Sequence, residues 1–143
     1  MKTLKQENME TTKNTNSKIE KGTFKNKLVK RMDDFVHFIY KITKNYPKEE
    51  LYGSTNQLRR ASLSVILNYI EGYARRRPAT QLTFFETAYG SLKESSYLLD
   101  FSKDEGWLYI NDYDSAKKLV DEIGAMLWTE IKNLDNSIKL SKL

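Results

Sequence analysis

Apolar residues recur every three or four positions along four stretches of the chain, which is the spacing of helices. No stretch shows the strict alternation of a half-buried strand. The predicted helices run over 24–45, 57–77, 80–104 and 112–140. Four helices joined by short connections predict an all-α fold, an antiparallel up-and-down four-helix bundle over residues 24–143.

The predicted helix 57–77 is apolar around an unusually large part of its circumference. Its apolar residues cover about 200° of a helical projection, roughly twice a normal core-facing stripe. Such a helix is buried between neighbours of one bundle, or it packs on its bundle with one flank and on another subunit with the other. We favour the second alternative, because one four-helix unit offers a thin core. We therefore predict an oligomer interface at Leu63, Ile66 and Ile70.

A continuous polar seam occupies the rest of this helix. It consists of Gln57, Arg60, Ser64, Asn68, Glu71 and Arg75, and the candidate partner on the next helix is Glu94. One interpretation is that the seam is simply the solvent-facing side. Ser and Asn are weak helix formers, however, and solvated faces usually carry Lys, Glu and Gln. A polar network at a helix or subunit contact explains the seam better.

The two ends of the helix carry their own signals. Ser54 and Gln57 match the S-x-x-Q capping box, in which each side chain bonds a free backbone amide. Pro78 should end the helix at Arg77, because the residue before a proline avoids helical geometry.

Arg59 lies within the apolar arc, so it either extends to solvent, which we favour, or pairs with an acid from elsewhere.

The net charge of +5 is concentrated near the N-terminus. Residues 1–31 hold nine Lys or Arg against three Glu, whereas residues 32–143 hold fifteen against sixteen acids. We predict a flexible basic arm over residues 1–23, either a solubilising extension, which we favour, or a tail that seeks polyanions.

Basic clusters in the folded part attract phosphates but also occur on ordinary surfaces. The candidate nucleic-acid contacts are Lys25, Lys27, Lys30, Arg31, Arg59, Arg60, Arg75, Arg76 and Arg77.

The residue types of common catalytic and metal sites are scarce. The chain has no cysteine, and its one histidine, His37, has only Asp33 at helical spacing as a second ligand. Neighbouring acids do not face one another, and no phosphate-binding loop or nucleophile motif is present. We therefore predict a protein that is not an enzyme and uses no metal or cofactor. No apolar run suits a membrane span or signal peptide, so a cytoplasmic location is expected.

Two stretches of the sequence resemble a known family, the small four-helix-bundle proteins encoded in intervening sequences of 23S rRNA. They are YPKEELYGSTNQLRRASLSVILNYIEGYAR at 46–75 and FFETAYGSLKESSYLL at 84–99. The matching positions are QLRRA at 57–61, NxxEG at 68–72 and GSLxE at 90–94. More distantly, the chain is similar to the accessory variability-determinant proteins of diversity-generating retroelements.

The resemblance implies a homopentameric, barrel-like arrangement of bundles and a role in binding RNA or other nucleic acid. It implies no catalytic residue. Together with the wide apolar arc and the basic clusters, it leads us to expect a non-enzymatic homo-oligomer, most simply a pentamer, that binds nucleic acid. The alternative is a protein-interaction scaffold whose partner is a protein such as a reverse transcriptase.

Overall fold

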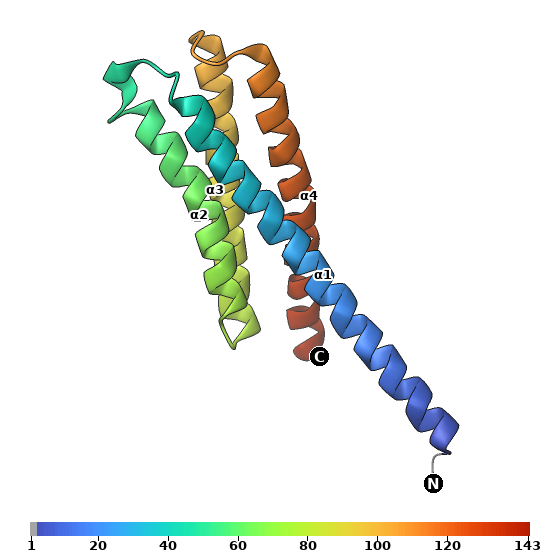
Figure 1. Cartoon of the computed structure of the whole chain (residues 1–143). Helices are drawn as coiled ribbons and strands as arrows, with labels where there is room; N and C mark the ends of the chain where they lie inside the picture. Colours follow the sequence, from blue (N-terminus) through green and yellow to red (C-terminus); the bar gives the residue numbers. More distant parts are fainter. Residues whose placement is uncertain (1–2) are drawn as a thin grey trace.

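The fold was analysed in a computed structural model that describes the backbone of residues 3–143 and the side chains of Thr3 and residues 22–143. Within these residues the chain forms helices and no strand, which confirms the all-α prediction (Figure 1). The elements are α1 (Leu4–Thr43), the short 3-10 helix η1 (Lys48–Glu50), α2 (Ser54–Tyr73), α3 (Pro78–Asp104) and α4 (Ile110–Ser141).

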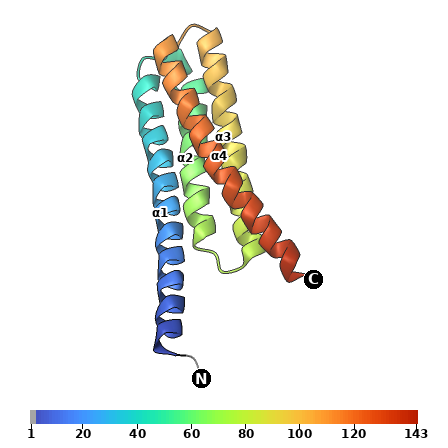
Figure 2. The same cartoon turned by 90° about the vertical axis from the view of Figure 1, so that its right-hand side faces the viewer.

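The four α-helices form the predicted antiparallel up-and-down bundle. Each helix lies beside its neighbours in the sequence, and α4 closes the bundle by packing against α1 (Figures 1 and 2). The diagonal pairs, α1 with α3 and α2 with α4, do not approach each other in the described backbone. The bundle therefore has four sides, and the α1/α2 side lies opposite the α3/α4 side.

Apolar side chains from every helix fill the centre of the bundle. Burying one large apolar side chain contributes roughly 1.5–3 kcal/mol. The fully buried large residues include Leu28, Met32, Phe35, Ile39, Leu58, Val65, Tyr69, Leu92, Leu99, Ile123 and Leu127. Near the end of α2, Gly72 allows a close approach to α3, because a Cβ there would lie 2.7 Å from the Cβ of Phe84.

The first helix begins earlier than the sequence pattern predicts. α1 starts at Leu4, whereas the periodic apolar positions begin near residue 24. Residues 1–2 and the side chains of residues 4–21 lie outside the described part. The basic arm over residues 1–23 therefore stays a prediction.

The capping box predicted at the start of α2 is wrong. Gly53 is the residue before the helix, and no side chain caps it in the predicted way. Instead, the Ser54 backbone N–H donates to Oε2 of Glu50 over 3.1 Å. The turn of η1 brings this carboxylate back to the helix start, where a negative charge is favourable. A carboxylate from the preceding turn has thus taken the place of the predicted capping side chains.

The turn between α2 and α3 also differs from the prediction. α2 ends at Tyr73 rather than at Arg77, and Pro78 is the first residue of α3. Proline suits that position because its missing N–H would have had no partner in the first turn. Arg77 has the extended backbone expected of a residue before proline, with φ −88° and ψ 126°. Three consecutive arginines thus lie on a turn and not on a helix.

Candidate nucleic-acid and subunit interfaces

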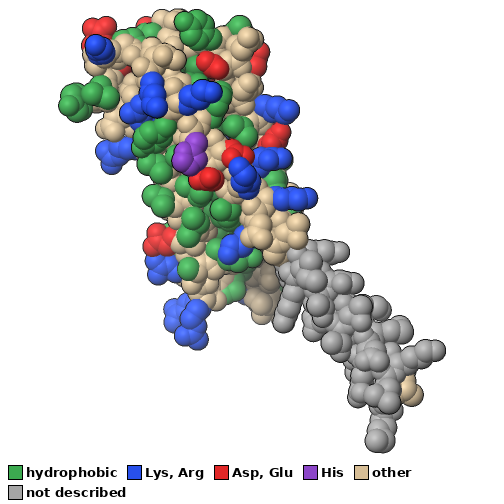
Figure 3. All heavy atoms as spheres, viewed as in Figure 1, with side chains coloured by type: hydrophobic (Ala, Val, Ile, Leu, Met, Phe, Trp, Pro, Cys, Tyr) green, Lys and Arg blue, Asp and Glu red, His purple; other side chains and the backbone are tan. Residues whose placement is uncertain are grey.

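The basic residues near the α2–α3 turn gather at one end of the bundle. We call Arg75, Arg76 and Arg77 the arginine turn. The Nζ of Lys25 on α1 lies 3.9 Å from the centre of the Tyr73 ring. Tyr73 is the last residue of α2 and lies two residues before Arg75. Lys and Arg side chains are visible at this lower end of the α2–α3 pair in Figure 3. Residues far apart in the sequence therefore form one cationic end.

The candidate cations differ in whether an acid already neutralises them. Lys30 pairs with Asp34, Arg31 Nε lies 3.0 Å from Glu122 Oε2, and Arg75 lies 2.6 Å from Glu71 Oε1. No acid of the described chain lies within ion-pair distance of Lys27, Arg76 or Arg77. Arg76 and Arg77 are also exposed. Lys27 and Arg60 are exposed as well and have no acid of the described chain within ion-pair distance, so Arg76 and Arg77 are distinguished by being adjacent on one turn.

Arg59 and Arg60 lie at the opposite end of α2, away from the arginine turn. Arg59 Nε donates to Thr43 Oγ1 over 2.9 Å, and the guanidinium stacks 4.8 Å from the Tyr40 ring centre. No acid of the described chain pairs with Arg59, so the second alternative is not seen, and the side chain packs on α1 while it stays partly exposed to solvent. The nine predicted cations therefore do not form one continuous surface.

The middle of the polar seam lies at the contact between α2 and α3. The hydroxyl oxygens of Ser64 and Ser91 are 2.8 Å apart. Asn68 Nδ2 donates to the carbonyl and to the hydroxyl of Ser64, over 2.8 and 2.9 Å. At this point a hydrogen bond between two small polar side chains links the two helices, and Asn68 supports it from within α2.

The ends of the seam are more exposed than its middle. Gln57, Arg60 and Glu94 line a shallow pocket of about 370 Å³ next to Ser64. Glu94 forms no ion pair with Arg60 in the described chain. At the other end of the seam, Glu71 forms an ion pair with Arg75, which lies one turn further along the same helix.

The predicted oligomer interface is partly inside the chain's own core and partly on its surface. We call Leu63, Ile66, Leu67 and Ile70 the α2 stripe. Ile66 packs against the core and Leu63 is half-buried, whereas Leu67 is 58% and Ile70 is 49% exposed. Leu63 is three residues from Ile66 and four from Leu67, and Ile70 is four and three residues from the same two, so the four side chains lie on one face of the helix. The chain's own helices cover only the inner edge of that face.

A second apolar feature, which the sequence did not predict, lies between α3 and α4. We call it the α3–α4 groove, about 460 Å³ of open space with an apolar floor and charged residues at its edges. It is lined by Leu82, Glu86, Tyr89, Gly90, Trp128, Ile131, Lys132 and Asp135. The Trp128 and Tyr89 rings are 5.3 Å apart, and Trp128 is 48% exposed. The available sequence signals were Trp128, an apolar outlier on its helix, and a glycine in mid-helix.

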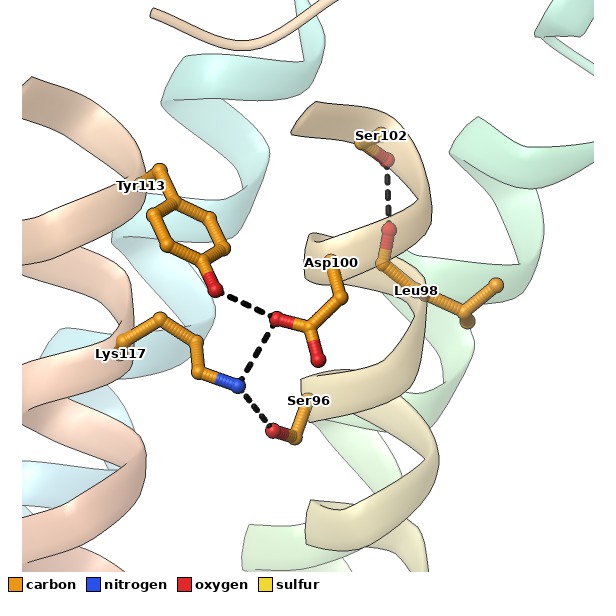
Figure 4. A network of polar contacts seen from close by, with 6 residues as sticks. All are labelled: Ser96, Leu98, Asp100, Ser102, Tyr113 and Lys117. Atoms are coloured by element: carbon orange, nitrogen blue, oxygen red, sulfur yellow. Dashed lines mark hydrogen bonds and ion pairs between the residues drawn. The ribbon is translucent and has the colours of Figure 1, made fainter. Parts of the chain in front are cut away.

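A polar network near the α3–α4 turn was also missed. Asp100 Oδ1 accepts hydrogen bonds from the Tyr113 hydroxyl over 2.7 Å and from Lys117 Nζ over 3.0 Å, and Lys117 also donates to Ser96 (Figure 4). Partial burial would raise the pKa of Asp100, but these two donors outweigh it and lower that pKa. The hydrogen bond to Asp100 raises the pKa of Tyr113 to about 12. Every member has a partner, so the network joins helices and leaves no reactive group.

Other kinds of site receive no support from the described residues. No group of three or more His, Cys, Asp or Glu side chains among them is placed to hold a metal ion. His37 lies on the surface with Nε2 3.3 Å from Asp33. No described helix combines the length and the apolar character of a membrane span.

The sequence and the fold can now be compared with known proteins. The family model of the 23S rRNA-intervening sequence proteins matches residues 24–129. This chain belongs to that family. The match includes the arginine turn, the α2 stripe and most of the α3–α4 groove, so these features lie in the part of the chain that defines a 23S rRNA-intervening sequence protein.

A solved structure supports the same fold. It is a Bacteroides thetaiotaomicron protein of unknown function from the S23 ribosomal protein family, 20% identical to this chain, with a TM-score of 0.67. The similarity covers 73% of this chain and 98% of the other. No curated protein is significantly similar in sequence.

Proposed function

We propose that this member of the 23S rRNA-intervening sequence protein family is a non-enzymatic binding protein that assembles as a homo-oligomer, most simply a pentamer, and holds RNA. The observation that carries the RNA proposal is the arginine turn, where Arg76 and Arg77 are exposed without an acidic partner and Lys25 lies close by. The family name refers to 23S rRNA, which agrees with RNA as the ligand. The exposed part of the α2 stripe supports self-association.

The arginine turn would act mainly by charge. Each phosphate neutralised by Lys or Arg releases counterions, so affinity falls with salt by a slope of about −0.7 per contact on single strands. The half-exposed Tyr73 ring beside Lys25 offers a surface on which an unpaired base could stack. Assembly would place several arginine turns in one particle, and a long RNA could then bind several at once. The bundle carries no recognised base-reading motif, so little sequence preference is expected.

A charge reversal at the arginine turn tests this proposal. The variant Arg76→Glu with Arg77→Glu should lower the affinity for a labelled single-stranded RNA by at least tenfold and flatten its salt dependence. The matched control is Lys44→Glu with Lys48→Glu, which changes the net charge equally at the other end of the bundle. Binding is measured by fluorescence anisotropy over a salt series, and native mass checks that both variants assemble like the parent.

Equal RNA binding by the two variants would contradict the proposal. It would favour the rival proposal, in which the oligomer is a scaffold for a protein partner such as a reverse transcriptase.

A further inference from the structure

Two apolar features of the described surface lack a partner, and they lie on opposite sides of the bundle. Arg59, Ile66 and Tyr73 are spaced seven residues apart, so they share one line along α2. Arg59 and Tyr73 both contact residues of α1, which shows that this line faces α1. Ile70 lies about 40° from this line, whereas Leu67 lies about 100° from it and points away from the bundle. The exposed edge of the α2 stripe therefore runs from the outer face of α2 towards the α1/α2 side. The α3–α4 groove belongs to the opposite side.

One position of the groove lining, Gly90 on α3, carries no side chain. A Cβ added to Gly90 would meet nothing within 4 Å. The Tyr89 and Trp128 rings lie beside this gap, and Lys132 Nζ lies 5.8 Å from the Trp128 ring centre. Glycine in mid-helix is less favourable than alanine, and no described residue fills the space that it leaves.

We infer that the α2 stripe of one copy packs into the α3–α4 groove of the next copy, in a head-to-tail contact. This inference rests on the self-association in the proposed function and names the two surfaces that meet. A convex row of branched aliphatic side chains suits a concave surface with exposed rings. The lengths agree as well, because the stripe spans eight residues from Leu63 to Ile70, about 10 Å, and the α4 wall spans eight from Trp128 to Asp135.

The groove lining holds three charged residues, Glu86, Lys132 and Asp135, and Asp135 pairs with Lys139, so Glu86 is the acid left for a cation of another copy. Arg60 borders the stripe, three residues before Leu63, and Glu86 lines the groove. Neither forms an ion pair within the described chain. A head-to-tail contact would let Arg60 of one copy meet Glu86 of the next. Two stripes packed on each other would instead leave both grooves, with their Trp128 rings, open to water.

Complementation between two blocked variants tests the inference with the full-length chain. Leu67→Arg with Ile70→Arg blocks the stripe, and Gly90→Arg blocks the groove without touching the core. Each variant alone should be monomeric by native mass spectrometry. Mixed one to one, they should form a heterodimer and nothing larger, because only one intact stripe and one intact groove remain. Tyr52→Arg, at a position 92% exposed and far from both surfaces, is the control that should assemble normally.

The outcomes separate this inference from the proposed self-association. A monomeric parent chain would overturn both. An oligomeric parent whose Gly90→Arg variant still assembles, or two blocked variants that stay monomeric when mixed, would overturn only the head-to-tail contact. Circular dichroism verifies that each variant keeps its helices.

A charge swap gives a second, milder test. Arg60→Glu and Glu86→Arg should each weaken association roughly fivefold, and the double variant should recover most of the loss. Absence of recovery in the double variant would contradict the pairing of these two residues.

Discussion

The Tyr69 hydroxyl on α2 donates a hydrogen bond of 2.9 Å to Oε1 of Glu130 on α4. Their two helices make no backbone contact, so the bond crosses the bundle diagonally. The other carboxylate oxygen, Oε2, is buried without a hydrogen-bond partner. Burial raises the pKa of Glu130, although the bond from Tyr69 and the nearby Lys25 oppose that change. A partly buried acid near the cationic end of the bundle thus lacks full solvation.

Replacing Glu130 should change how stability depends on pH. Because its folded-state pKa lies above the ordinary 4.5, the folded chain holds this proton more tightly than the unfolded chain does. The free energy of unfolding should therefore fall as pH rises from 4.5 through the folded-state pKa. Glu130→Gln keeps an acceptor for Tyr69 without the charge, and it should raise stability at neutral pH by about 1 kcal/mol.

Urea unfolding at a series of pH values measures this effect. The exposed Glu49→Gln serves as the control and should leave the pH profile unchanged. A Glu130→Gln profile parallel to that of the parent chain would contradict the assignment.

Two glycines in the bundle should respond in opposite ways to alanine. At Gly72 a Cβ would lie 2.7 Å from the Cβ of Phe84 and 3.0 Å from the Phe85 ring, so α2 and α3 would have to separate. We expect Gly72→Ala to destabilise the fold by about 1–3 kcal/mol. Gly90→Ala meets open space and should stabilise the helix by about 1 kcal/mol. Thermal unfolding measures the stability of both variants. If Gly72→Ala stabilised the fold as Gly90→Ala is expected to, the close approach at Gly72 would be wrong.

The Asp100 network should lose its effect in acid. Its donors lower the pKa of Asp100 below the ordinary 3.8, so its contribution is present above 3.8 and is lost as pH falls through the folded-state pKa. Asp100→Asn should cost roughly 0.5–1 kcal/mol at neutral pH, since the side chain is half exposed, and nothing in strong acid. The pKa of Tyr113 should also drop from about 12 towards 10.0.

An NMR titration of labelled tyrosine follows the Tyr113 change directly, with Asp121→Asn as a control on the same helix. An unchanged Tyr113 titration in the Asp100→Asn variant would rule out the hydrogen bond between them.

The helices were predictable because apolar periodicity reflects burial in one bundle. Val65 and Tyr69 lie on the strongly apolar arc, and both are fully buried. What failed were signals within one helix that residues outside that helix could override. Glu50 takes the place of the capping box at Ser54, and Thr43 with Tyr40 holds Arg59. A sequence shows the spacing of residues within one helix but not which helix lies opposite.

The candidate surfaces were predictable only in part, for the same reason. The three arginines before Pro78 stand out in the sequence, but their closeness to Lys25 depends on how α1 packs against α2. The wide apolar arc indicated that part of the helix surface is not covered by its own bundle. The structure shows that this part is centred on the exposed residues Leu67 and Ile70. The α3–α4 groove arises from Gly90 and Trp128 on different helices, and no single-helix pattern reveals it.

The central claim is that copies of this chain cover one another's apolar flank. The native mass of the full-length protein at micromolar concentration, without and with RNA, tests it most directly. The account predicts a defined multiple of the 16.8 kDa chain that persists without RNA and gains RNA mass when it is added at low salt. A single 16.8 kDa species under both conditions would contradict it.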